Sequence, residues 1–162
     1  EQLGNDSMLH SVYVNKAELT VDVLYSDSVT GRPRDNWDVP ASHMMLIRES
    51  HLEDFFAKNT TTLDSVAIVA PLSASADDSG EISYHYTYDL STLLTLQLRQ
   101  EQKLDELKFA LIPVSITSNS STGSITSIRQ LQTISTTCIR SAANSVNPMN
   151  IEMVYCSFNR TH

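Results

Sequence analysis

The chain has 162 residues, of which 41% are hydrophobic, and a formal net charge of −8 at pH 7. A chain of this size and composition can bury a core of its own, which argues for one folded domain and against disorder. The negative charge disfavours nucleic acid and anionic lipid as partners, because both are bound through lysine and arginine side chains. No apolar run approaches the roughly 20 residues that a membrane-spanning helix requires.

The first predicted strand covers 12–25, where apolar and polar residues alternate from Lys16 onward. Val12 and Val14 lie on the opposite phase, so we expect a bulge near Asn15. Residues 27–40 are punctuated by glycine, proline and asparagine, which indicates a loop. The run 41–48 is almost continuously apolar and predicts a strand that is covered on both faces.

Shorter elements follow. Residues 51–58 are interpreted as a single helical turn or a loop, and 65–70 as a strand closed by Pro71. The turn residues of 77–80 lie where a hairpin into the next strand would need them.

The segment 82–98 changes its hydrophobic period in the middle. From Ile82 to Tyr88 the large apolar residues fall at every second position, which is typical of a strand with one face in the core. From Leu90 onward they recur at helical spacing, which predicts a short helix at about 91–101. Asp89 or Ser91 can cap this helix by accepting a hydrogen bond from a free backbone N–H.

The C-terminal third predicts more β-structure. Residues 108–117 form a buried strand interrupted by Pro113, 118–124 an exposed and flexible loop, and 133–141 and 150–158 two last strands. Strands separated by turn signals, with a single clear helix, favour a mainly β fold. We therefore predict an antiparallel β-sandwich rather than a parallel α/β sheet.

Cys138 and Cys156 are the only cysteines, and each lies in one of the two last predicted strands. These strands look like neighbours, so a disulfide can form if the two Cα atoms come within about 7 Å. The alternative is two small buried thiols. Neither cysteine has the histidine neighbours of a zinc site.

Enzyme signatures are weak. The four glycines form no phosphate-binding loop, and the sequence holds neither G-x-S-x-G nor H-E-x-x-H. His85 and Asp89 share a strand face about 13 Å apart, too far for a hydrogen bond. A carboxylate pair of a glycan-active hydrolase stays open as an alternative. Calcium bound by Asp77, Asp78 and Glu81 is a further alternative. We nevertheless expect no catalytic residue, metal or cofactor.

The best candidate binding site is the loop that contains Trp37, the only tryptophan. Aromatic faces stack on sugar rings, and the neighbouring Arg32, Arg34 and Asp35 can bond sugar hydroxyls. Loops on a rigid sandwich are where such sites usually occur. The alternative is a Trp37 that packs back over the end of the core.

Four blocks occur in an order that suggests a family: VNKAELTV at 14–21, YDLSTLL at 88–94, FALIPV at 109–114 and NIEMVY at 150–155. In these blocks the chain resembles a family of secreted Bacteroidetes lipoproteins of unknown function. The resemblance implies a jelly-roll-like sandwich, similar to modules of carbohydrate-associated and cell-surface bacterial proteins. It further implies a lipid anchor upstream of residue 1 and display in the periplasm or on the outer membrane. The matching blocks carry no catalytic signature.

Together these observations predict that residues 1–162 are a single sandwich domain, the C-terminal part of a longer exported protein. Its expected role is non-enzymatic, as a surface or periplasmic domain that binds a glycan or a protein or contributes to surface architecture. The alternatives are the carboxylate-dependent hydrolase and a structural subunit that assembles through an exposed edge strand.

Overall fold

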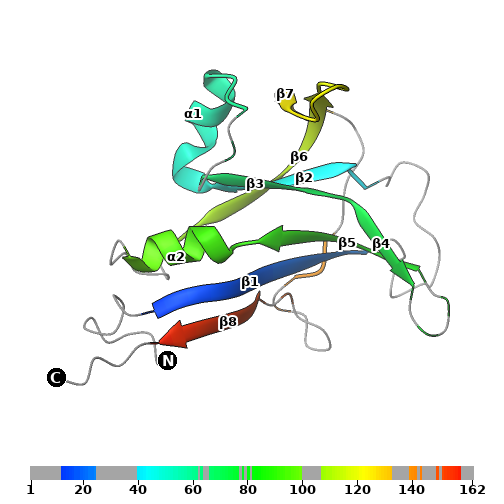
Figure 1. Cartoon of the computed structure of the whole chain (residues 1–162). Coiled ribbons are helices and arrows are strands. Elements are labelled where there is room, and N and C mark those ends of the chain that lie inside the picture. The colour runs from blue at the N-terminus through cyan, green and yellow to red at the C-terminus, as the bar shows by residue number, and fades with distance from the viewer. Residues whose placement is uncertain are drawn as a thin grey trace.

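The computed structural model describes residues 12–24, 40–61, 63, 66–76, 78, 80, 82–99, 107–132, 139–141, 143, 149 and 151–157. They form two four-stranded antiparallel sheets, ordered β4-β5-β1-β8 and β3-β2-β6-β7, which pack together as a sandwich (Figure 1). The predicted mainly β, antiparallel sandwich is confirmed. The strands of the first sheet are β1 Val12–Val23, β4 Ser73–Ala76, β5 Ile82–Asp89 and β8 Ile151–Ser157. Those of the second are β2 His43–Arg48, β3 Ala67–Pro71, β6 Phe109–Ser118 and β7 Ile125–Gln130.

Strand β1 lies inside the first sheet, between β5 and β8. Its alternating apolar residues face the core, and Ala17 and Val21 are fully buried. The register with β8 shifts between Val14 and Lys16, so the predicted bulge at Asn15 is confirmed. The extra residue puts Val14 on the same face as Ala17, which explains why both are buried although three positions separate them.

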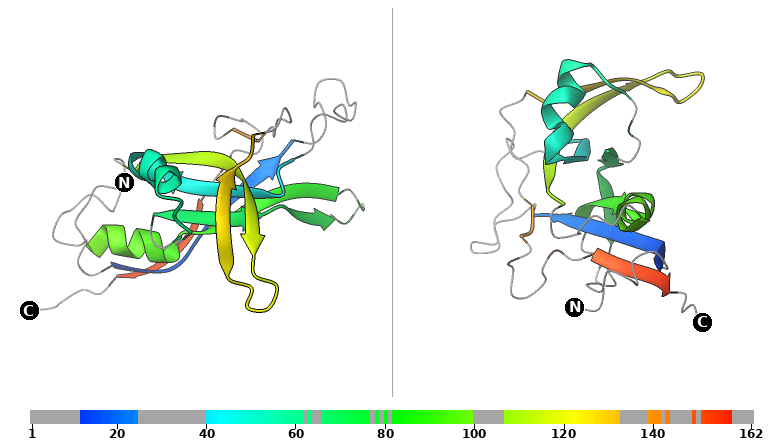
Figure 2. Two further views of the ribbon diagram at one scale, coloured as in Figure 1. Left: turned by 90° about the horizontal axis from the view of Figure 1, so that it is seen from above. Right: turned by 90° about the vertical axis from the view of Figure 1, so that its left-hand side faces the viewer.

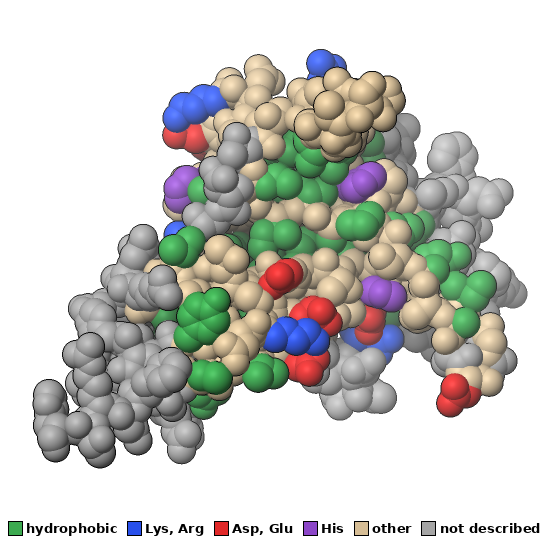
Figure 3. Space-filling view, viewed as in Figure 1, with side chains coloured by type: hydrophobic (Ala, Val, Ile, Leu, Met, Phe, Trp, Pro, Cys, Tyr) green, Lys and Arg blue, Asp and Glu red, His purple; other side chains and the backbone are tan. Residues whose placement is uncertain are grey.

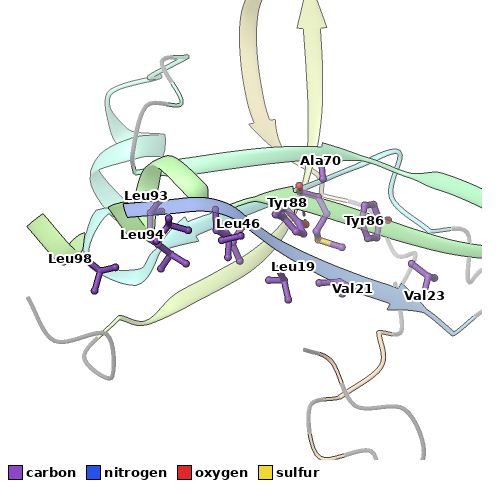
Figure 4. Packing of buried hydrophobic residues seen from close by; sticks show 14 residues of the cluster. Leu19, Val21, Val23, Leu46, Ala70, Tyr86, Tyr88, Leu93, Leu94 and Leu98 are labelled. Atoms are coloured by element: carbon purple, nitrogen blue, oxygen red, sulfur yellow. Dashed lines mark hydrogen bonds between the residues drawn. The ribbon is translucent and has the colours of Figure 1, made fainter. Parts of the chain in front are cut away.

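Strand β2 is covered on both faces, as its continuous apolar run predicted. Met44 and Leu46 belong to the core between the sheets, which also contains side chains of β1, β5 and the helix after β5 (Figure 4). Met45 and Ile47 belong to a second core on the outer side of the second sheet. This second core is closed by helix α1, Leu52–Ala57, which buries Phe55 and follows a 3-10 turn at Glu49–His51 (Figure 2). The helical interpretation of 51–58 is therefore the right one.

The predicted step from strand to helix is confirmed. Strand β5 ends at Asp89, and helix α2, Ser91–Arg99, starts two residues later. The Asp89 carboxylate accepts hydrogen bonds from the Ser91 backbone N–H, at 2.9 Å, and from the Ser91 hydroxyl. Tyr86 and Tyr88 are fully buried on the core face. Their hydroxyls donate to backbone carbonyls of Ala41 and Met44 and so join the two sheets.

Three details differ from the predicted strands. Pro113 does not interrupt β6, which runs from Phe109 to Ser118. Its carbonyl accepts a hydrogen bond from Leu131 just beyond β7, so the N–H that proline lacks would point to a place where the β7 ladder already ends. Strands β7 and β4 were missed because few or only small apolar residues mark them. In the expected strand 133–141, the described residue Ile139 forms only an isolated bridge, to Val23.

Candidate functional site

The four edge strands of the two sheets differ in what they expose. Strands β3 and β4 follow one another through Leu72 and carry the chain from one sheet to the other. Strand β4 has only serine and alanine, and β7 turns Ile128 inward and exposes polar residues. Strand β8 is different, because the large side chains of Ile151, Val154 and Tyr155 are 52%, 49% and 43% exposed. The adjacent Tyr13 on β1 is 49% exposed.

The exposed apolar side chains of β8 lie on both faces of the sheet. Met153 pairs with the buried Ala17 and packs against the core, so Ile151 and Tyr155 project to this same side. Val154 projects to the outer face, as do Glu152 and Cys156. Figure 3 shows hydrophobic side chains at the surface over the neighbouring ends of β1 and β8, beside a group of charged side chains. A strand with apolar residues on both faces normally lies inside a sheet rather than at its edge.

Within the described residues, one side of the β8 backbone pairs with no strand, and this side is called its free side. Ala17 on β1 donates its N–H to the Ser91 hydroxyl and accepts at its carbonyl from the Leu90 N–H, so its polar groups point towards α2. Its β8 partner Met153 therefore points its own N–H and C=O away from β1. Since backbone direction alternates along a strand, Ile151 and Tyr155 do the same. Among the described residues no strand pairs with this side of β8.

The charged side chains near β8 contact one another. Glu152 is the one charged residue of the strand, and its carboxylate lies 3.4 Å from the ammonium group of Lys16. Lys16 also lies 3.7 Å from the carboxylate of Glu18. Both contacts are exposed and each contributes little to stability. They leave the edge without an isolated charge in the part of the chain that the structure describes.

Cys156 is an exposed free thiol whose sulfur accepts a hydrogen bond from the Asn15 amide at 3.0 Å. We expected the last two predicted strands to be neighbours, and the structure shows that they are not. Cys156 pairs beside Tyr13 at one end of β1, whereas Ile139 bridges Val23 at the other end, ten positions or about 33 Å along the strand. Strand β1 is long enough to pair with β8 near its start and with Ile139 at its end, and the sequence could not indicate this. Cys138 itself lies outside the described residues.

The predicted ligand loop with Arg32, Arg34, Asp35 and Trp37 also lies outside the described residues, so glycan binding there stays a prediction. Of the acidic turn, Asp78 is described and exposed. The described residues contain no group of three metal-ligating side chains close enough to hold an ion.

Asp89 and Tyr88 have structural roles in the hydrogen-bond network. Hydrogen bonds from the Ser91 hydroxyl and backbone lower the pKa of the Asp89 carboxyl, so this group caps α2 instead of orienting His85. Burial, together with the neighbouring Tyr86, raises the pKa of the Tyr88 hydroxyl above its ordinary value. That hydroxyl donates to Met44.

The sequence did contain a signal for the β8 edge. Four consecutive residues, Met153 to Cys156, are apolar, and this pattern is typical of strands covered on both faces.

No family model, curated protein or solved structure matches this chain. No helix in the described ranges is long and apolar enough to span a membrane.

Proposed function

We propose that this chain is a non-enzymatic, exported interaction domain that binds an extended segment of another polypeptide along the free side of β8. The observation that carries the proposal is found on one strand: its outward backbone groups pair with no described strand, and its apolar side chains are exposed. An added strand gains affinity from main-chain hydrogen bonds and specificity from the alternating side chains.

Within the described residues, the free side of β8 lacks three common protections against strand addition. Edge strands are commonly blocked by proline, by an outward lysine or by a bulge. Strand β8 has neither proline nor lysine, and the bulge beside it belongs to β1, so β8 itself stays regular. The opposite flank of β1 is closed instead, because Ser91 and Thr95 of α2 bond to the backbone of Ala17 and Val14.

Two carboxyl groups of the described residues have shifted pKa values, and both take part in structural contacts. A glycosidase needs a carboxylic acid whose pKa is raised so that it stays protonated. The pKa of Asp54 is lowered by its hydrogen bond to Lys58, and that of Asp89 by its hydrogen bonds to Ser91.

Export to the periplasm or the cell surface is proposed from the resemblance to secreted Bacteroidetes lipoproteins.

Photo-crosslinking in the producing cell tests this function. Tyr155 of the full-length protein is replaced by the photoreactive p-benzoylphenylalanine, expressed in a Bacteroidetes host, and irradiated. We expect a polypeptide adduct, because an added strand would lie within reach of this side chain. The matched control places the same group at Thr126, an exposed residue of the polar edge strand β7. Absence of an adduct from position 155, or equal adducts from both positions, would contradict the proposal.

A further inference from the structure

We infer that the polypeptide bound at β8 is a second copy of this chain, paired antiparallel to the first about a two-fold axis at Val154. This inference rests on the proposed function and names its partner. Pairing of the two β8 strands would join the sheet β4-β5-β1-β8 of one copy to the same sheet of the other, as one continuous sheet. Such an interface is isologous and closes on itself, so it gives a dimer rather than a fibre.

The direction of the backbone groups and the length of the strand together select the register. Because Ile151, Met153 and Tyr155 present their N–H and C=O to the free side, these odd-numbered positions must face one another across the new ladder. In an antiparallel pair of identical strands, the paired residue numbers have a constant sum. A sum of 308 pairs all seven residues of Ile151–Ser157 and places Val154 opposite Val154 of the second copy.

The side chains fit this register. Met153 faces Tyr155 of the second copy on the core side, where a thioether against an aromatic ring is favourable. On the outer face, the two Val154 side chains cover one another. Val154 and Tyr155 thus gain cover from Val154 and Met153 of the second copy, and Ile151 lies diagonally across from its Tyr155.

Charge is compatible with the same register. Glu152 lies opposite Cys156 of the second copy, so no like charges meet, whereas a two-fold axis at Glu152 would place two carboxylates together. The formal charge of −8 on each copy still opposes association at long range. Added salt screens this repulsion, so we expect the dimer to become tighter as ionic strength rises.

Disulfide trapping tests the register directly. Glu152→Cys places a thiol opposite the natural Cys156 of the second copy, at a non-hydrogen-bonded pair where Cβ atoms are closest. Within one copy, positions 152 and 156 are about 13 Å apart along the strand and cannot bond. Under mild oxidation, in a Cys138→Ser background, we expect Glu152→Cys to give a covalent dimer. Adding Cys156→Ser should abolish it.

The matched control is Glu18→Cys, which places the thiol on the adjacent position of β1, one strand away from the interface. It should stay uncrosslinked. In sedimentation equilibrium the chain without added cysteines should be a dimer. Ile151→Pro should weaken that dimer about tenfold or more, because proline removes one outward N–H without touching the β1 ladder.

The outcomes separate the inference from the proposed function. A chain that stays monomeric at all concentrations and salt levels, with no crosslink in Glu152→Cys, overturns self-pairing. If Tyr155 photo-crosslinking then gives an adduct with another protein, binding at β8 stands and only the identity of the partner was wrong. If neither method gives an adduct, both proposals fail. A dimer that Ile151→Pro leaves unchanged uses another surface and likewise overturns the inference.

Discussion

Asp89 and Ser91 show how two neighbouring side chains convert a strand into a helix. The Asp89 carboxylate accepts from Ser91, and the Ser91 hydroxyl accepts from the Ala17 N–H on β1. The backbone groups that would be left free where β5 ends are therefore satisfied by a cap at one point and a side-chain bond at the other. A helix can start here without leaving the edge of β1 open.

Replacing Asp89 with Ala should lower the free energy of unfolding by about 1 kcal/mol, the usual value of a lost helix cap. Because the folded pKa of Asp89 lies below its ordinary value of 3.8, its charged form stabilises the fold above that pH. The difference between the wild type and Asp89→Ala should disappear as the pH falls through the lowered folded pKa. Urea unfolding between pH 7 and pH 2 measures this.

Asp89→Asn serves as the control, because its amide oxygen keeps the acceptor without the charge. Its loss of stability at pH 7 should be smaller than that of Asp89→Ala and its own cap should not titrate. An Asp89→Ala deficit that stays constant down to pH 2 would argue that the carboxylate is not the capping group.

At the scale of elements, helix α2 covers one end of the first sheet on its core side. Its buried leucines Leu93, Leu94 and Leu98 meet the core side of β1, as Figure 4 shows. Its polar residue Gln97 is also buried and accepts a hydrogen bond from Arg48 at the end of β2. The helix thus contacts both sheets, through apolar packing on one and a polar bond on the other.

Leu98→Ala should therefore cost about 2–5 kcal/mol of unfolding free energy, since this side chain is 1% exposed and its removal leaves a cavity. The matched variant is Leu96→Ala on the same helix, where the side chain is 37% exposed. Its cost should stay below about 1 kcal/mol. Chemical denaturation of both variants checks the contrast, and equal losses would mean that α2 does not pack as described.

At the scale of the whole molecule, β2 couples two hydrophobic cores. Met44 and Leu46 belong to the core between the sheets, and Met45 and Ile47 to the core under α1. Neither core can lose its packing without disturbing the strand that serves the other. The two cores should consequently unfold as one cooperative unit.

Phe55→Ala tests this coupling, because Phe55 lies in the core under α1 and does not belong to the core between the sheets. It should cost about 3–5 kcal/mol. Near-UV circular dichroism, which senses the buried Tyr86 and Tyr88 of the other core, should shift to the same midpoint as the far-UV signal. A near-UV transition that does not move would show that the two cores unfold separately.

The parts of the fold that were predicted correctly depend on local periodicity. The alternation in β1 and β5, the continuous run of β2 and the step at Asp89 are fixed by the spacing of apolar residues along a few turns or pleats. The bulge at Asn15 belongs to this class, because a change of phase within one strand can be read without knowing its partners.

What only the tertiary structure decided is which strands are neighbours. The polar strand β7 is a strand because β6 pairs with it, and Pro113 is tolerated because β7 ends beside it. The same holds for β8: its four consecutive apolar residues are typical of a strand covered on both faces, but strand order placed it at an edge. Periodicity specifies which face of a strand is apolar, while hydrogen-bond partners come from residues far along the chain. The sequence by itself therefore determined the apolar side chains of β8, and the order of the described strands left them at the edge of a sheet.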